Sequence, residues 1–107
     1  MLTTLNYEAM SSTPKKPVEI QKEFVGQLKF PREEVLKNPD LQKERTQSIL
    51  NATRLGNGSK IKVKIIFEDS EGLKLVYTTI WGATPNFIIL KRGVTIPINR
   101  IHFISAY

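Results

Sequence analysis

The feature that most constrains the fold of this chain is a change in the spacing of its apolar residues at Lys60. Over residues 60–67 polar and apolar side chains alternate, with Lys60, Lys62 and Lys64 on one face and Ile61, Val63, Ile65 and Phe67 on the other. Because successive side chains of a strand point to opposite faces, this period of two predicts a half-buried β-strand. Its apolar face then needs a second layer of structure to cover it.

Four further short strands are expected at about residues 73–81, 87–91, 94–98 and 101–105, separated by polar or glycine-containing turns. Pro97 cannot donate a ladder hydrogen bond, so its strand is expected to lie at a sheet edge or to end there. The strands at 73–81 and 87–91 are apolar on both faces. Their second face is expected to meet a helix, a bent sheet or another subunit.

A helix is expected before the strands, from about Pro39 to Leu55. Asn38 is its expected N-cap, and Gly56 is expected to end it in a left-handed conformation. The side chains expected to pack form a narrow stripe of Leu41, Ile49, Ala52 and Leu55, with Leu50 beside it. A preceding helical zone is expected from Pro31, because a proline and the acidic Glu33 and Glu34 suit the first turn of a helix.

These elements predict an α+β fold, mainly β, in which an N-terminal helix is followed by a five-stranded antiparallel small barrel. Residues 31–107 are expected to form this domain. Residues 1–30 are expected to be a flexible N-terminal arm and linker, since residues 11–17 hold two prolines among small polar and basic residues. Within the arm, residues 18–30 fit either a short amphipathic helix or a segment that docks on a partner.

The residue types argue against catalysis. The chain has no cysteine and one histidine, which excludes a disulfide framework, a cysteine-ligated zinc site and thiol catalysis. No nucleophile–base pair, phosphate-binding loop or dinucleotide fingerprint is present either. We therefore expect a protein that is not an enzyme, with no cofactor, catalytic residue or metal ligand. The acidic run of Glu68, Asp69 and Glu71 is expected to be a turn, and His102 an ordinary strand residue.

No apolar run approaches the roughly 20 residues that a membrane span needs. Residues 1–17 also lack the basic leader and apolar core of a secretory signal. A cytoplasmic protein without a membrane partner is expected.

The net charge of +6 is concentrated in one half of the chain. Residues 54–107 hold eight basic residues against three acidic ones, an excess of +5. A basic domain attracts polyanions, of which nucleic acid is the commonest in a cell. An excess of this size is equally typical of a small protein whose surface charge only keeps it soluble.

Residues 86–90 and 96–101, with Gly93 between them, resemble the Sm-like proteins, a group of SH3-like small barrels. The resemblance covers about residues 40–106. It implies RNA binding by the loops before the third and fifth strands, where Asn86 and Arg100 stand; the acid that usually precedes this asparagine is replaced by Thr84 and Pro85. Residues 54–57, 78–81 and 96–101 also resemble a family of small uncharacterised bacterial proteins, which implies a bacterial cytosol.

The leading candidate site is the row of strand lysines at 60, 62 and 64. Side chains on one face of a strand lie roughly 6.5–7 Å apart, close to the phosphate spacing of an extended single strand. Lys91 and Arg92 form a second basic point at an expected hairpin tip. Together with the residues that the resemblance implies, the candidate nucleic-acid-binding set is Lys60, Lys62, Lys64, Asn86, Lys91, Arg92 and Arg100. The alternative interpretation is that these basic residues bind nothing and lie on a solvated surface, where lysines protect strands against edge-to-edge aggregation.

Tyr77 and Trp81 would stack on bases if exposed, but a lone tryptophan beside a glycine favours a core position. Two functions therefore stay open. The first is a small basic module that binds nucleic acid, as RNA or single strands, through a basic barrel face. The alternative is a protein-interaction or structural adaptor, self-associating or with another protein, and without a nucleic-acid role. A regulatory small-molecule binder is a third option, and it requires a pocket.

Overall fold

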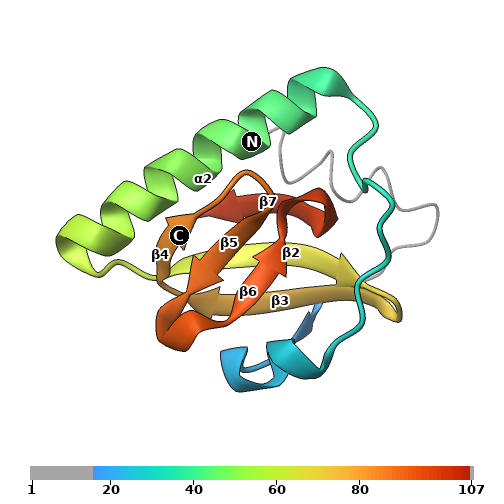
Figure 1. The fold of residues 1–107 in the computed structure, drawn as a ribbon, viewed down its shortest axis with the longest axis horizontal. Coiled ribbons are helices and arrows are strands. Elements are labelled where there is room, and N and C mark those ends of the chain that lie inside the picture. The colour runs from blue at the N-terminus through green and yellow to red at the C-terminus, as the bar shows by residue number, and fades with distance from the viewer. Residues whose placement is uncertain (1–15, 107) are drawn as a thin grey trace.

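The computed structural model describes residues 16–106, which form an α+β fold that is mainly β (Figure 1). The helical elements are the 3₁₀ turns η1 (Lys22–Gln27), η2 (Lys91–Gly93) and η3 (Ile98–Arg100) and the helix α2 (Pro39–Ser59). The strands are β1 (Val18–Glu19), β2 (Val63–Asp69), β3 (Gly72–Thr78), β4 (Ile80–Ala83), β5 (Phe87–Leu90), β6 (Thr95–Pro97) and β7 (Ile101–Ser105).

The strands form two sheets instead of the expected five-stranded barrel. The first sheet has the order β1-β3-β2-β7 and the second has the order β4-β5-β6, and the two do not close into a barrel. The expected strand at 73–81 is divided at Thr79, because Thr78 still pairs with Val63 of the first sheet whereas Ile80 pairs with Leu90 of the second. β1 adds a further strand by pairing in parallel with β3. The described residues therefore hold seven strands.

The core lies between the two sheets and α2. Its largest fully buried side chains come from both sheets and include Phe67, Ile65, Ile80, Ile88, Leu90, Ile96 and Ile101. Ile66 is also buried, so the middle of β2 is covered on both faces and departs from the simple alternation expected there. Ile61, expected in the apolar row, is exposed because β2 begins only at Val63.

The helix α2 begins where the sequence predicts and ends later. The Asn38 side chain accepts a hydrogen bond from the Asp40 backbone N–H at 2.7 Å, which confirms the predicted N-cap. Gly56 does not end the helix, which continues to Ser59, and Lys60 takes the left-handed conformation with φ of 58°. The buried stripe of the helix is Arg45, Ile49, Ala52 and Gly56, whereas Leu50 is exposed.

Residues 31–38 cross the molecule as an irregular strap, and the helical zone expected from Pro31 is wrong. One tertiary partner and one local side chain take hydrogen bonds that a helix would use. The Val35 N–H donates to the carbonyl of Asn99, and the Glu34 carboxylate accepts from the Leu36 N–H. The strap is thereby fixed between the start of α2 and η3.

The described part of the expected arm contacts the sheets. β1 pairs with β3, the Ile20 N–H donates to the carbonyl of Leu75, and Val25 of η1 is fully buried. Residues 1–15, which include most of the expected linker, lie outside the described residues. The division between an arm of residues 1–30 and a domain from residue 31 stays a prediction.

Candidate nucleic-acid interface

The three lysines at 60, 62 and 64 do not stand in one strand as expected. Lys60 caps α2, with its N–H donating to the carbonyl of Gly56, and Lys62 lies in the connection to β2. Lys64 is the one of the three that belongs to β2. All three side chains are exposed. The prediction that these lysines form an evenly spaced row on one strand is therefore wrong. The left-handed conformation of Lys60 ends the helix, and β2 begins only at Val63.

Tyr77 and Trp81 are exposed, and the expected core position of Trp81 is wrong. Tyr77 keeps 49% and Trp81 keeps 47% of its surface accessible. Each ring has a lysine over it: the Lys60 ammonium lies 5.8 Å from the Trp81 ring centroid and the Lys62 ammonium 5.7 Å from the Tyr77 ring centroid. At these distances an ammonium is attracted by the ring quadrupole. Two solvent-facing rings are thus paired with two cations.

The pairing of β2 with β3 explains why Tyr77 faces solvent beside these lysines. Lys64 and Tyr77 are direct cross-strand partners, so their side chains leave the sheet on the same face. Val76 and Thr78, on either side of Tyr77, point to the opposite face and are buried. The sequence gives no signal for this choice of face, because the buried face carries the polar Lys74 and Thr78 and the other face carries Leu75 and Tyr77.

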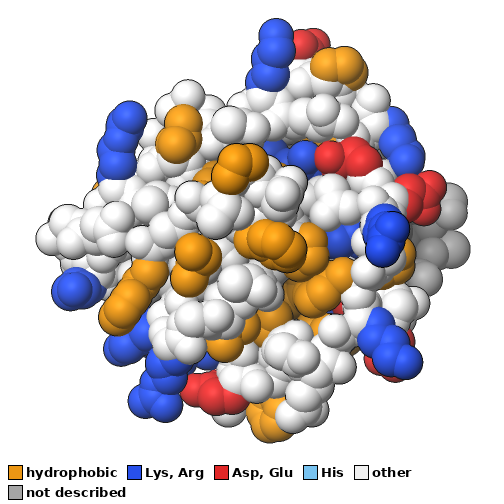
Figure 2. Space-filling model, in the orientation of Figure 1, with side chains coloured by type: hydrophobic (Ala, Val, Ile, Leu, Met, Phe, Trp, Pro, Cys, Tyr) orange, Lys and Arg blue, Asp and Glu red, His pale blue; other side chains and the backbone are white. Residues whose placement is uncertain are grey.

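The Lys91–Arg92 turn lies at the same end of the molecule. β4 and β5 are antiparallel and Ile80 pairs with Leu90, so Trp81 and Lys91 follow this pair in opposite directions. Arg92 has a left-handed backbone with φ of 70° and an exposed side chain. Figure 2 shows Lys and Arg side chains gathered at the lower left beside hydrophobic ones, around the turn between β5 and β6 in Figure 1. We call the exposed set Lys60, Lys62, Lys64, Tyr77, Trp81, Lys91 and Arg92 the lysine–aromatic surface.

Asn86 and Arg100 are not part of this surface. Asn86 is exposed in the turn before β5, at the opposite end of that strand from Lys91, and its carbonyl accepts a hydrogen bond from the Ile98 N–H. Arg100 keeps only 5% of its surface exposed. Its Nε donates to the carbonyl of Glu68 at 3.0 Å and its Nη1 to the carbonyl of Glu33 at 2.6 Å. Arg100 therefore holds the strap against β2 and is not presented as an open cation.

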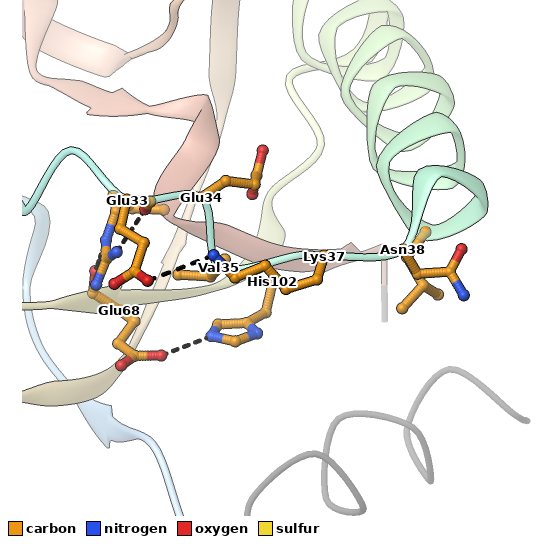
Figure 3. Close-up of a pocket in the computed structure, with 9 residues that line it drawn as sticks. Glu33, Glu34, Val35, Lys37, Asn38, Glu68 and His102 are labelled. Carbon is orange, nitrogen blue, oxygen red and sulfur yellow. Dashed lines mark hydrogen bonds and ion pairs between the residues drawn. The ribbon is translucent and has the colours of Figure 1, made fainter.

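A cleft of about 630 Å³ lies between the strap, the start of α2 and β7. Figure 3 shows Glu68 and His102 pointing toward each other on one side of it and Asn38 at the start of the helix on the other. His102 Nε2 lies 2.9 Å from Glu68 Oε1. The residues that line the cleft are Glu33, Glu34, Val35, Lys37, Asn38, Leu41, Glu68, Arg100 and His102. Sequence reasoning did not predict this cleft, because its residues come from three separate segments.

A partly buried ion pair supports the strap behind the cleft. The Arg45 guanidinium binds both carboxylate oxygens of Glu34 at 2.7 Å and also donates to the carbonyl of Ile101 at 3.0 Å. Burial opposes ionisation of Glu34, but the hydrogen bonds from Arg45 and from the Leu36 N–H outweigh it. The pKa of Glu34 is consequently lowered below its ordinary value of 4.5.

The turn expected over the acidic run is shorter than predicted, because Glu68 and Asp69 belong to β2 and only Ser70 and Glu71 form the turn. One Asp69 oxygen accepts hydrogen bonds from the N–H groups of Glu71 and Gly72 and from the Lys74 ammonium at 3.1 Å. Although burial opposes its ionisation, these donors lower the pKa of Asp69. Among residues 16–106, no group of three or more acidic or histidine side chains is placed to hold a metal ion.

Comparison of this chain with protein-family models, with curated proteins and with solved structures finds no match. Within the described part of the chain, no helix has both the length and the apolar character needed to cross a membrane.

Proposed function

We propose that this protein is a non-enzymatic, cytoplasmic module that binds single-stranded nucleic acid through the lysine–aromatic surface. The observation that carries the proposal is the pairing of two half-exposed rings, Tyr77 and Trp81, with the ammonium groups of Lys62 and Lys60. Aromatic rings offer stacking platforms to unpaired bases, and ammonium groups neutralise the phosphates between them. Each ring lies less than 6 Å from an ammonium group, so a base stacked on the ring would have a cation nearby for its phosphate.

The chemistry favours single strands over duplexes. In a duplex the flat faces of the bases are stacked on one another, so protein rings cannot reach them without unstacking. Stacking works with every base, and the lysines bind phosphates without reading sequence, so this surface is expected to bind with little sequence preference. Asn86 and Arg100 are not required, since neither lies on this surface.

A fluorescence titration tests the proposal. Trp81 is the one tryptophan of the sequence and it is exposed, so its emission should be quenched when a base stacks on it. We expect quenching by oligo(dT) or oligo(U), with a binding constant that falls with salt. Five phosphate contacts would give a slope of about −3.5 in a log–log plot. No quenching at low salt, or affinity independent of salt, would contradict the proposal.

A charge-reversal pair provides the control. Lys60→Glu should weaken binding and reduce the salt slope by more than half a unit, because one phosphate contact is lost. Lys43→Glu changes the net charge equally but lies on α2 roughly 25 Å away along the helix axis. Equal losses in the two variants would indicate a general charge effect and argue against a defined surface.

The second candidate is a protein-interaction or adaptor role, with a partner protein or a second copy of this chain. It is favoured by the exposed apolar side chains of Val18 and Phe24, which stand close together in the sequence on β1 and η1. Light scattering over a concentration series tests self-association. A mass above the monomer that falls in Phe24→Ser would support it, and a monomer at every concentration would contradict it.

A further inference from the structure

The outer face of the second sheet is apolar, and no helix or strand of the described residues covers it. Ile88 and Leu90 of β5 are fully buried on the inner face. Phe87 and Ile89 alternate with them and therefore point outward, and Pro97 of β6 pairs with Phe87 on the same face. Figure 1 shows β5 and β6 in front of the first sheet with no other element in front of them. The second apolar face expected of this strand is thus left toward solvent, with Phe87 42% exposed.

A hollow of about 530 Å³ continues this face beyond the start of β5. Phe87 and Pro97 belong to both the face and the hollow, and Pro85 and Ile98 extend the apolar lining. Figure 2 shows hydrophobic side chains gathered across the middle of this view. An exposed apolar patch beside a hollow is typical of an interaction site. We call the set Pro85, Phe87, Ile89, Pro97 and Ile98 the outer apolar face.

The exposed cations at the two ends of this face are unpaired. Residues 75–90 and 93–99 contain no Asp, Glu, Lys or Arg, so the face itself carries no charge. Arg32 lines the hollow at the start of β5, and Lys91 and Arg92 follow the end of that strand, about 13 Å further on. All three side chains are exposed, and none has an ion-pair partner within residues 16–106.

The acids beside the outer apolar face are engaged with other cations. Glu34 also lines the hollow, but both of its carboxylate oxygens bind Arg45 at 2.7 Å. Glu23 lies on η1, which contacts β6, and it pairs with Lys22 at 3.3 Å. A second copy of this face would set cations against cations, which is unfavourable. A partner that covers the face therefore has to bring its own negative charge.

We propose that the outer apolar face binds an acidic segment of a partner protein, with an apolar side chain in the hollow and carboxylates opposite the cations at the two ends. The apolar contacts supply affinity, and the charges at the rim select an acidic sequence. A nucleic-acid strand fits this face poorly, because its middle offers no cation to the phosphates. The inference does not depend on nucleic-acid binding, and the surface differs from that of Val18 and Phe24.

Selection from a phage-displayed library of random dodecapeptides tests the proposal, with the whole chain as bait. We expect enriched peptides that combine Asp or Glu with large apolar residues. The most enriched peptide, synthesised with a fluorescent label, then gives a dissociation constant by fluorescence anisotropy. The absence of enrichment, or the enrichment of peptides without acidic residues, would overturn the proposal.

Two matched pairs of variants locate the binding site of that peptide. Phe87→Ser should weaken binding about tenfold, whereas Leu50→Ser, at an exposed apolar position of α2, should leave it unchanged. Arg32→Glu should weaken binding about threefold, and Lys43→Glu, an equal charge change on α2, should not. A loss in Lys60→Glu without a loss in Phe87→Ser would place the peptide on the lysine–aromatic surface and overturn the proposal. Equal losses in Arg32→Glu and Lys43→Glu would overturn it as well, since they would indicate general charge attraction.

Discussion

The α-carbon of Gly56 lies directly against the backbone carbonyl of Ile80, where the helix α2 meets the first residue of β4. A Cβ atom at position 56 would overlap the carbonyl oxygen of Ile80 and lie 2.9 Å from Cγ2 of Thr79. Thr79 is the residue at which the chain passes from the first sheet to the second. This contact therefore fixes the end of the helix to the bend, and with it the positions of Lys60 and Trp81, which follow shortly after.

Gly56→Ala should destabilise the protein by about 3 kcal/mol, because the added methyl group forces helix and strand apart at a backbone contact. Gly58→Ala provides the control. It lies in the same helix with nothing within 4 Å of its added Cβ, so it should stabilise by about 0.5–1 kcal/mol. Urea unfolding of both variants measures the difference. If both alanines were neutral or stabilising, the close approach would be disproved.

Lys60→Gly should stabilise the fold and weaken nucleic-acid binding at the same time. A left-handed conformation costs a residue with a side chain about 1 kcal/mol more than it costs glycine. The substitution also removes the ammonium over Trp81. Urea unfolding together with the salt dependence of oligo(dT) affinity separates the two effects. If the variant is more stable and its affinity for oligo(dT) is unchanged, Lys60 is not part of the nucleic-acid-binding surface.

Trp81→Ala and Tyr77→Ala should each weaken binding to oligo(U) by about 1–3 kcal/mol if each ring stacks on a base. Phe87→Ala is the control, because Phe87 is an exposed aromatic residue outside the lysine–aromatic surface. Its affinity should stay within about twofold of the unmodified protein. Fluorescence anisotropy of a labelled oligonucleotide measures all three, since it does not depend on Trp81. Comparable losses in all three would show that the effect is not specific to these rings.

The Glu34–Arg45 pair should make the free energy of unfolding depend on pH in the acidic range. Because the folded protein lowers the pKa of Glu34 below its ordinary 4.5, the pair contributes stability that is fully present above about pH 5. That contribution is lost as the pH falls through the lowered folded pKa. Glu34→Gln should cost roughly 2 kcal/mol at pH 7, less than for a fully buried pair because Glu34 is partly exposed.

The deficit of Glu34→Gln should shrink as the pH falls below 4.5, because the carboxyl group of Glu34 takes up a proton in the unfolded protein before it does so in the folded one. Free energies of unfolding from urea titrations at pH 7, 5, 4 and 3 test the direction. Glu33→Gln is the control, because the Glu33–Lys37 pair is exposed on both sides and should contribute less than about 0.5 kcal/mol at any pH. A constant deficit of Glu34→Gln across this range would contradict the assigned pKa shift.

Sequence patterns predicted the structural elements that are stabilised by residues close together in the chain. The Asn38–Pro39–Asp40 cap was readable because a side chain two residues away satisfies the helix N–H group. The strands at residues 87–90 and 101–105 followed from alternation and turn residues, and the strand expected at 60–67 was found at 63–69. The α+β class that is mainly β follows from these elements alone.

The candidate site was only partly predictable. Lys60, Lys62, Lys64, Lys91 and Arg92 were singled out, and their side chains are exposed. The rings that accompany them were expected to be buried, because apolar character predicts burial without saying which face of a strand is covered. Arg100 was expected on the surface, because a charged side chain is seldom buried unless distant carbonyls receive its hydrogen bonds.

The sequence by itself determined the alternation, the helix start and the basic excess of its second half, since each depends on residues close together in the chain. Only the tertiary structure decided that Gly56 is a contact point and not a helix stop, since the carbonyl it meets belongs to Ile80. It likewise decided that Lys60 and Lys62 stand over Trp81 and Tyr77. These outcomes depend on segments that are distant in sequence and meet only when the two sheets and the helix pack together.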